Sequence, residues 1–144
     1  MIDDCAKHDT AFISDEIYDR LTYGVRPTTA LALSENAIVI NSFSKYYCMT
    51  GWRIGWMVVP EALLRTVERL AQNHFICPPH ISQIVALAAM DCEDELSANL
   101  ETYSANRTLL LDALPGMGFA DFAPADGAFS VSYTHLTLPT ILLV

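Results

Sequence analysis

Three short apolar runs come early in the chain, and each is followed by polar or turn-forming residues. They span residues 11–14, 37–42 and 54–59. Their length and apolar character are typical of strands, and we expect the first of them to be a buried strand. The first run leads into Asp15 and the second ends at Ser42, while Pro60 stops the third. Because ligands bind outside the carboxyl ends of strands in open α/β sheets, Asp15 and residues 42–45 are candidate ligand-binding positions.

After residue 60, apolar residues recur at steps of three and four, which is typical of amphipathic helices. This spacing predicts helices over residues 60–75, 80–92 and 94–114. We expect the second of these helices to be largely buried, because Ala, Ile and Leu dominate it. Shorter elements are expected at residues 2–8 (the end of a helix), 30–36 (a loop or a turn of helix) and 118–122 (a strand). Strands combined with helices in this way indicate the α/β class.

The composition indicates a globular protein and argues against several classes of partner. The 144 residues are 52% hydrophobic and carry a formal net charge of -9, so nucleic acid and anionic membrane surfaces are not expected partners. No apolar run is long enough to span a membrane, and the first residues lack the basic and apolar regions of a signal peptide. The four cysteines (Cys5, Cys48, Cys77 and Cys92) have no metal-binding spacing. We therefore expect free thiols, no bound metal and a cytoplasmic protein.

The most informative stretch is residues 42–56, which holds a single lysine, Lys45, among apolar and aromatic neighbours. Burial disfavours the charged form of an amine, and a lysine with a lowered pKa can form Schiff bases with carbonyl compounds. Arg53 keeps its charge, and its planar fork fits phosphate oxygens. Ser42 and Ser44 offer hydroxyl groups to the same anion. The stretch therefore predicts an amine that accepts an aldehyde beside an anion-binding group.

Three motifs, taken in chain order, resemble those of the class I/II aminotransferases of fold type I, which depend on pyridoxal 5′-phosphate (PLP). Ser42–Lys45 followed by Gly51–Gly55 resembles the lysine motif of this family. Asp15–Tyr18 resembles its upstream aspartate–tyrosine motif, and Pro124–Phe129 resembles the strand that enters its small C-terminal domain. The matches cover about residues 2–130. Their combination is far more specific than a lone Ser-x-x-Lys.

The resemblance implies chemical roles for three residues. Lys45 would be the catalytic residue, because its amine would form a Schiff base with the PLP aldehyde and later carry a proton between substrate and cofactor. Asp15 would keep the pyridine nitrogen protonated so that the ring acts as an electron sink, and Tyr18 would hydrogen-bond the ring oxygen O3′. From the residues alone, each has a plainer alternative: a surface lysine, a helix cap and a core tyrosine, respectively.

The resemblance assigns the PLP phosphate to Ser42 and Arg53, with Ser44 as a further contact. For Arg53 the open alternative is a simple ion pair with a carboxylate. The resemblance also implies that the chain lacks several family elements: the glycine-rich phosphate loop, the aromatic residue that stacks on the PLP ring, and the arginine that binds the substrate carboxylate.

The resemblance implies an α/β fold of the aspartate aminotransferase-like type, truncated at both ends. Residues 1–114 would form the C-terminal half of the PLP-binding large domain with its connecting helices, and residues 115–130 would begin the small domain. The implied activity is amino-group transfer between an amino acid and a 2-oxo acid by a homodimer. A PLP-dependent C–S β-lyase, a decarboxylase and a non-catalytic PLP-sensing regulator domain remain alternatives. We expect the isolated chain to be inactive, because its sheet edges and apolar faces would lack partners.

The last residues depart from the family pattern. The run from Val131 to Thr140 resembles the in-frame translation of a transposase-type sequencing-library adapter. We therefore expect the natural sequence to end near Ser130 and residues 131–144 to be an artefactual tail, which is excluded from fold reasoning. The alternative is a genuine strand, because apolar and polar residues alternate through the same run.

Overall fold

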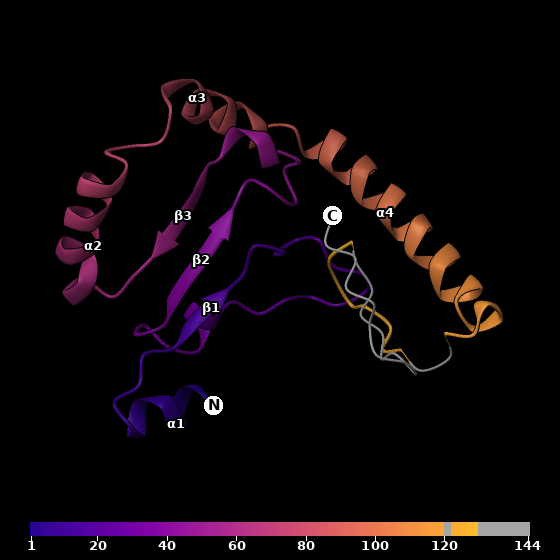
Figure 1. Cartoon of the computed structure of the whole chain (residues 1–144), viewed down its shortest axis with the longest axis horizontal. Helices are drawn as coiled ribbons and strands as arrows, with labels where there is room; N and C mark the ends of the chain where they lie inside the picture. Colours follow the sequence, from indigo (N-terminus) through magenta and orange to yellow (C-terminus); the bar gives the residue numbers. More distant parts are fainter. Residues whose placement is uncertain (120–121, 130–144) are drawn as a thin grey trace.

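The computed structural model describes residues 1–119 and 122–129. At its centre is a three-stranded sheet with the order β1–β2–β3, formed by Ile13–Asp15, Ile38–Ser42 and Gly55–Val58. β1 runs parallel to β2, whereas β3 is antiparallel to β2 (Figure 1). The carboxyl ends of β1 and β2 and the amino end of β3 therefore lie at the same edge of the sheet. The residues predicted to bind a ligand follow or precede these three strand ends.

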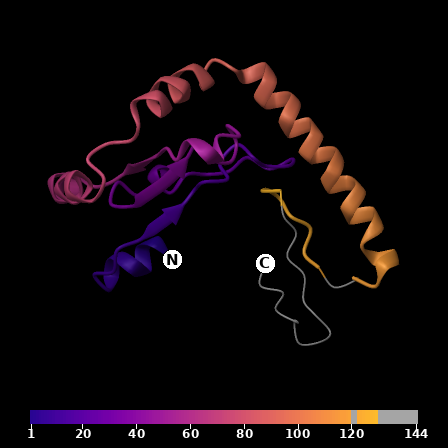
Figure 2. The ribbon, with the colours of Figure 1, turned by 45° about the horizontal axis from the view of Figure 1, so that its top comes forward.

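The described part of the chain contains four α-helices and three 3₁₀ helices. The α-helices are α1 (Ile2–Lys7), α2 (Glu61–His74), α3 (His80–Ala89) and α4 (Glu93–Ala113), and the 3₁₀ helices are η1 (Ala30–Ala32), η2 (Thr50–Trp52) and η3 (Pro115–Met117). α4 extends away from the sheet as a long arm, and residues 122–129 return from its far end toward the sheet (Figure 2). None of the described helices is long and apolar enough to cross a membrane.

Most of the predicted elements are confirmed. The three strands, α1, α2 and α4 agree with the predicted ranges to within two residues at each end, and η1 is the predicted helical turn. α3 ends at Ala89 rather than at residue 92, because residues 90–92 form the turn that leads into α4. In the predicted strand at 118–122, Gly118 has a left-handed backbone (φ 91) that ends η3, and residues 120–121 lie outside the described residues.

The buried residues form two small clusters rather than one core. One cluster lies between η1 and β2, with side chains from α1 and from the start of β1 packed against it: Ala30, Ala37 and Val39, with Ile2, Phe12 and Leu31. The other joins the segment after β2 to α3 through Phe43, Met49 and Ala86. This second cluster holds the segment that contains Lys45 against α3.

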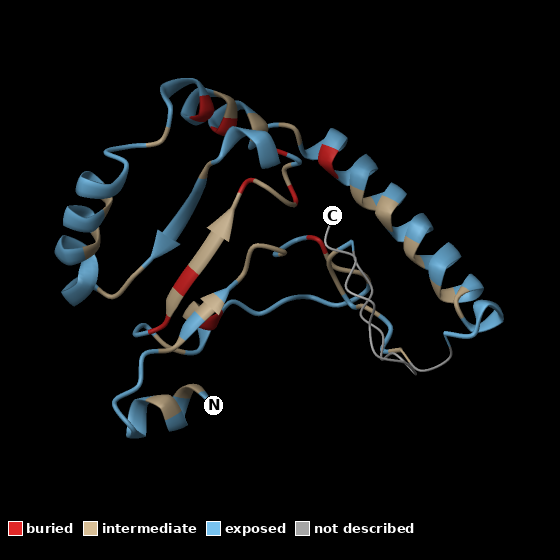
Figure 3. Ribbon diagram, viewed as in Figure 1, coloured by how far each residue is buried: buried red, intermediate tan, exposed pale blue. Residues whose placement is uncertain are grey.

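Two predictions about burial are wrong. β1 was expected to be a buried strand, but Ile13 is 59% exposed. α3 was expected to be largely buried, but three of its large apolar side chains are at least half exposed: Ile81, Ile84 and Leu87. Figure 3 accordingly colours much of the ribbon of α3 as exposed. An apolar pattern identifies a face that favours burial, yet burial also needs a second layer to cover that face. The described residues supply no such layer over these faces.

Candidate active site

The connection between β2 and β3, residues 43–54, folds back on its own first residue. The backbone N–H of Phe43 donates to the carbonyl of Ile54 (3.2 Å), and that of Met49 donates to the carbonyl of Phe43 (3.0 Å). Phe43 is buried, and its ring meets the edge of Trp56 at 5.2 Å between centroids. Since the two ends of the connection are hydrogen-bonded to each other and its first residue is buried, the backbone that carries Lys45 is well supported.

The Lys45 amine lies against two aromatic rings. Its Nζ is 5.3 Å from the centroid of Tyr18 and 5.1 Å from that of Phe129. The two rings meet each other edge to face at 5.7 Å. Ammonium groups at this distance from ring faces are attracted by the ring quadrupole. Tyr18 was predicted to belong to this site, whereas Phe129 was not assigned a site role.

Ser42, Ser44 and Arg53 are linked to one another. The Ser42 hydroxyl accepts a hydrogen bond from the Ser44 backbone N–H (3.0 Å) and donates to Ser44 Oγ (2.9 Å) or to the carbonyl of Ile54 (3.2 Å). Thr50 donates through its hydroxyl to the Ser44 carbonyl (2.7 Å) and accepts at its own carbonyl from Arg53 Nη1 (2.9 Å). When Ser44 Oγ accepts the Ser42 hydrogen, its own O–H remains free to donate to an anion.

A cavity of about 870 Å³ is lined by all three of these residues. Apolar side chains of α2 and β3, including Leu70 and Trp56, form other parts of its wall. Arg53 is exposed, and among residues 1–119 and 122–129 it belongs to none of the ion pairs. The simple ion pair that the sequence left open is therefore wrong for the described residues. A guanidinium beside two hydroxyls in an open cavity is chemically suited to a phosphate group.

Asp15 lies at the end of β1 and shares a second, smaller cavity of about 240 Å³ with Tyr18. One of its carboxylate oxygens accepts a hydrogen bond from the backbone N–H of Ile17 (3.3 Å). This is a contact within a turn rather than the helix cap that the sequence left open, because residues 17–20 form a turn and not a helix. It occupies a single acceptor site of an exposed carboxylate. The remaining acceptor capacity allows the carboxylate to receive a hydrogen bond from a ring N–H.

Glu16 is a supporting residue that sequence reasoning missed. Its Oε1 accepts from the backbone N–H of Ala30 (2.8 Å), and its own backbone N–H donates to the carbonyl of Ile40 (2.8 Å). It therefore joins the end of β1 both to β2 and to η1, directly beside Asp15. A lone glutamate after a strand has no spacing signal that would have revealed this role.

The structure thus brings the predicted residues together in three groups. Lys45 meets Tyr18, Asp15 shares a cavity with Tyr18, and the phosphate candidates (Ser42, Ser44 and Arg53) share the larger cavity. Phe129 is the residue that the sequence could not place, because its position depends on contacts between distant parts of the chain.

Comparison with known proteins identifies the family. The family model for aminotransferase class I and II matches residues 1–137. The chain belongs to this family. A valine–pyruvate aminotransferase of Mycobacterium tuberculosis is 50% identical over 131 residues, which are 88% of this chain and 34% of the relative. An arginine–pyruvate transaminase of Pseudomonas aeruginosa is 35% identical, over 87% of this chain and 33% of that protein.

Solved structures agree with the family assignment. A crystal structure from Silicibacter pomeroyi, assigned to the aminotransferases, superimposes with a TM-score of 0.85 at 57% identity and covers 88% of this chain and 34% of its own. The aspartate aminotransferase-like α/β fold is therefore confirmed. This aminotransferase chain spans about a third of the length of the relatives that it matches.

The family match also bears on the last residues. It extends into residues 131–137, within the stretch that the sequence analysis assigns to an artefactual tail. Residues 130–144 lie outside the described residues, so that assignment stays a prediction.

Proposed function

We propose that the whole protein transfers amino groups between an amino acid and a 2-oxo acid with PLP, and that this chain supplies part of the PLP site. The observation that carries the proposal is the position of the Lys45 amine. It lies against the Tyr18 ring, in the connection that also holds Ser44 and Arg53 and that follows directly after Ser42 at the end of β2. One edge of the sheet thus carries an amine, a phenol and a set of anion-binding groups. Together they can bind an aldehyde that bears a phosphate group.

The donor set fits PLP group by group. Ser42, Ser44 and Arg53 would hold the phosphate, because hydroxyls and a guanidinium line the same cavity. Asp15 would accept a hydrogen bond from the protonated ring nitrogen, and Tyr18 would donate its phenol hydrogen to the ring oxygen. When bound, PLP supplies an electron sink that makes the α-hydrogen of an amino acid acidic.

The chain's own residues would then divide the work. Lys45 would hold the aldehyde carbon through its nitrogen until an amino acid takes its place. The freed Lys45 amine would take the proton from the substrate α-carbon and return it to a neighbouring carbon, which is general acid–base catalysis by one group. Asp15 would keep a proton on the ring nitrogen by placing a negative charge beside it. Phosphate contacts at Arg53 would fix the distance between Lys45 and the reacting carbon.

The names of relatives favour this function over the alternatives from the same fold. The two curated relatives described above are named as aminotransferases that use pyruvate. This supports amino-group transfer, with pyruvate as a proposed 2-oxo acid, over a C–S β-lyase, a decarboxylase or a non-catalytic PLP-sensing regulator. None of the three sequence motifs specifies the amino acid that donates the group.

The proposed organisation follows the family. Residues 1–114 would be the C-terminal half of the large domain with its connecting helices, and residues 115–130 would begin the small domain. A homodimer is supported by the many large apolar side chains that this chain leaves exposed on β3, α2 and α3. The four free cysteines support a reducing, cytoplasmic location.

The test is PLP attachment in the whole protein. Addition of PLP should produce the visible absorbance of bound cofactor, and borohydride reduction should then leave the PLP mass on the peptide that contains Lys45. Lys45→Ala should remove both signals and amino transfer to pyruvate, whereas Lys7→Ala, in the exposed helix α1, should leave them unchanged. An unchanged spectrum in Lys45→Ala would refute the assignment. PLP attachment without amino transfer would favour one of the alternative reactions.

A further inference from the structure

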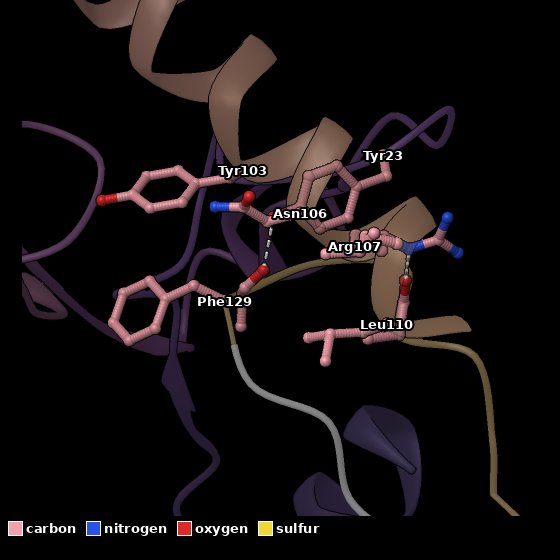
Figure 4. Close-up of a pocket in the computed structure, with 9 residues that line it drawn as sticks. Tyr23, Tyr103, Asn106, Arg107, Leu110 and Phe129 are labelled. Carbon is pink, nitrogen blue, oxygen red and sulfur yellow. Dashed lines mark hydrogen bonds between the residues drawn. The ribbon is translucent and has the colours of Figure 1, made fainter. Parts of the chain in front are cut away.

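Phe129 occupies a position that none of the proposed cofactor roles explains. Its ring lies 5.1 Å from Lys45 Nζ, 5.7 Å from the Tyr18 ring and 5.9 Å from the Tyr103 ring. The Phe129 side chain is 49% exposed, so packing in the hydrophobic core does not explain why it lies next to Lys45. Figure 4 shows the rings of Phe129 and Tyr103 one above the other at one end of a cavity of about 500 Å³.

The backbone just before Phe129 is tied to the loop after β1. The N–H of Ala128 donates to the carbonyl of Leu21 (2.9 Å), and the carbonyl of Ala128 accepts from the Tyr23 hydroxyl (2.7 Å). The Tyr23 backbone N–H donates to the carbonyl of Asp126 (2.9 Å). Thr22 and Gly127 form an antiparallel bridge between the same two segments. Residues 126–128 are therefore held by backbone and phenol contacts together.

Arg107 on α4 contacts the residue just before this segment and the Tyr23 ring as well. Its Nε donates to the carbonyl of Ala125 (2.6 Å), and its guanidinium lies 5.3 Å from the centroid of the Tyr23 ring. Figure 4 shows Tyr23 and Arg107 side by side at the end of the cavity away from the Phe129 ring. Burial raises the pKa of Tyr23, and the charge of Arg107 opposes that rise. The Tyr23 phenol therefore stays protonated and able to donate at neutral pH.

The backbone conformation of Ala128 shows that these hydrogen bonds impose a defined geometry on residues 126–128. Its φ is +62°, a left-handed value that is strained for a residue other than glycine. Such strain persists only where the surroundings impose it, and here both polar backbone groups of Ala128 are hydrogen-bonded to residues 21–23. The backbone direction at Ala128 determines where the next side chain, Phe129, points.

We propose that Phe129 is the outer wall of the Lys45 amine site, and that Tyr23 and Arg107 are positioning residues that hold it there. The wall acts by confining the amine, because contact with two rings removes much of the rotamer freedom of the lysine side chain before the amine meets an aldehyde. The role rests on the proposed function only in taking Lys45 as the reactive amine.

The chain offers an internal reference for a test, because Lys7 and Lys45 are its two lysines. In the full 144-residue chain without added PLP, a trace amount of acetic anhydride labels both amines, and mass spectrometry of the two peptides gives the ratio of their labelling rates. Lys7 is 71% exposed and reports the reagent itself. We expect Lys45 to be labelled more slowly than Lys7.

Phe129→Leu and Phe129→Ala should raise the Lys45:Lys7 ratio by about two- to fivefold, the size of one lost cation–π contact. Tyr23→Phe, which removes one hydroxyl, and Arg107→Lys, which cannot reproduce the Nε bond and the ring contact together, should raise it in the same direction by a smaller factor. Arg69→Lys on α2 is the matched control and should leave the ratio unchanged.

A second measurement separates this proposal from the proposed function. In the whole protein, the same Tyr23, Arg107 and Phe129 variants should slow the appearance of bound-PLP absorbance more than they lower its final amplitude. If Lys45 never takes up PLP, the proposed function fails while the labelling ratio still reports the wall. An unchanged ratio in both Phe129 variants, with wild-type circular dichroism, overturns the wall. An unchanged ratio in Tyr23→Phe and Arg107→Lys overturns the positioning role.

Discussion

The two sides of the Lys45 amine are built in opposite ways. On one side, Ser44 and Arg53 belong to a single connection that begins directly after Ser42 and whose flanking strands are paired within the same sheet. On the other side, Phe129 is placed by contacts that span up to 111 positions of the sequence, from Tyr18 to Phe129 itself. The first side depends on local geometry, and the second depends on the whole chain having folded. Substitutions on the two sides should therefore have effects of different size, and on different properties of the protein.

The largest effect is expected at Gly55, on the local side. A Cβ added there would lie 2.6 Å from the backbone oxygen of Asn41, and Gly55 pairs with Ser42 in the sheet register. Since neither backbone can move without breaking the β2–β3 pairing, Gly55→Ala should lower the free energy of unfolding by about 3 kcal/mol. Gly51→Ala, where an added Cβ meets no atom within 4 Å, is the control and should change it by less than about 0.5 kcal/mol. Urea denaturation of both variants measures the difference, and equal midpoints would contradict the expected clash.

Arg53 should show the next largest effect, on PLP affinity rather than stability. Within the described part of the chain, its exposed guanidinium is tied to the fold through Nη1, which donates to the Thr50 carbonyl. Arg53→Ala should therefore weaken PLP binding by about 10- to 100-fold, the size of a lost charge-assisted hydrogen bond. Equilibrium dialysis of PLP with the whole protein measures this. Arg65→Ala, which removes an exposed arginine paired with Glu68, should bind PLP normally. Equal losses in both variants would show a general charge effect instead of a phosphate site.

Gly127 tests the remote side. An added Cβ would lie 2.9 Å from the backbone oxygen of Leu21, so Gly127→Ala should separate the two segments that the Thr22–Gly127 bridge joins. We expect a loss of stability of about 1 kcal/mol, smaller than at Gly55, because the bridge is isolated and the sheet itself is untouched. Hydrogen exchange should accelerate at the Ala128 amide and stay unchanged within β2. Gly116→Ala, with no atom within 4 Å of the added Cβ, is the control. Protection at Ala128 equal to wild type would refute the clash.

The same contrast explains what the sequence could and could not predict. The strand ends at Asp15 and Ser42 follow from short apolar runs, and the grouping of Ser42 with Arg53 follows from their place at the two ends of one connection. The wall at Phe129 could not be predicted, because no local pattern tells which ring will meet a lysine in another part of the chain. The burial of α3 failed for a related reason, since an apolar face does not specify what covers it.

The smallest effect concerns Tyr46, whose hydroxyl donates to Glu93 Oε1 (3.3 Å) and so joins the Lys45 segment to α4. Burial raises the pKa of Tyr46 above the ordinary value of about 10, the nearby Glu93 carboxylate raises it further, and Arg20 lowers it. Because the folded state holds the phenol proton more tightly, this stabilisation is present below the unfolded pKa and is lost as pH rises through the folded pKa. Glu93→Gln should move the tyrosine transition that belongs to Tyr46 to lower pH, measured as the difference in tyrosinate absorbance at about 295 nm between variant and wild type. Glu95→Gln, in the same first turn of α4, should not, and equal shifts in both would rule out the local contact.

The isolated bridge between Thr22 and Gly127 also has a kinetic consequence. The β2–β3 pair joins residues only 13 positions apart at Ser42 and Gly55, whereas the bridge joins residues 105 positions apart. Loop closure at the longer separation costs about 2 kcal/mol more entropy, so this contact is expected to form late in folding. Pulsed hydrogen exchange should then protect the β2 amides before the Ala128 amide. A nascent chain would therefore form the phosphate-binding side of its site early. Lys45 would stay exposed there until Phe129 takes its place beside it.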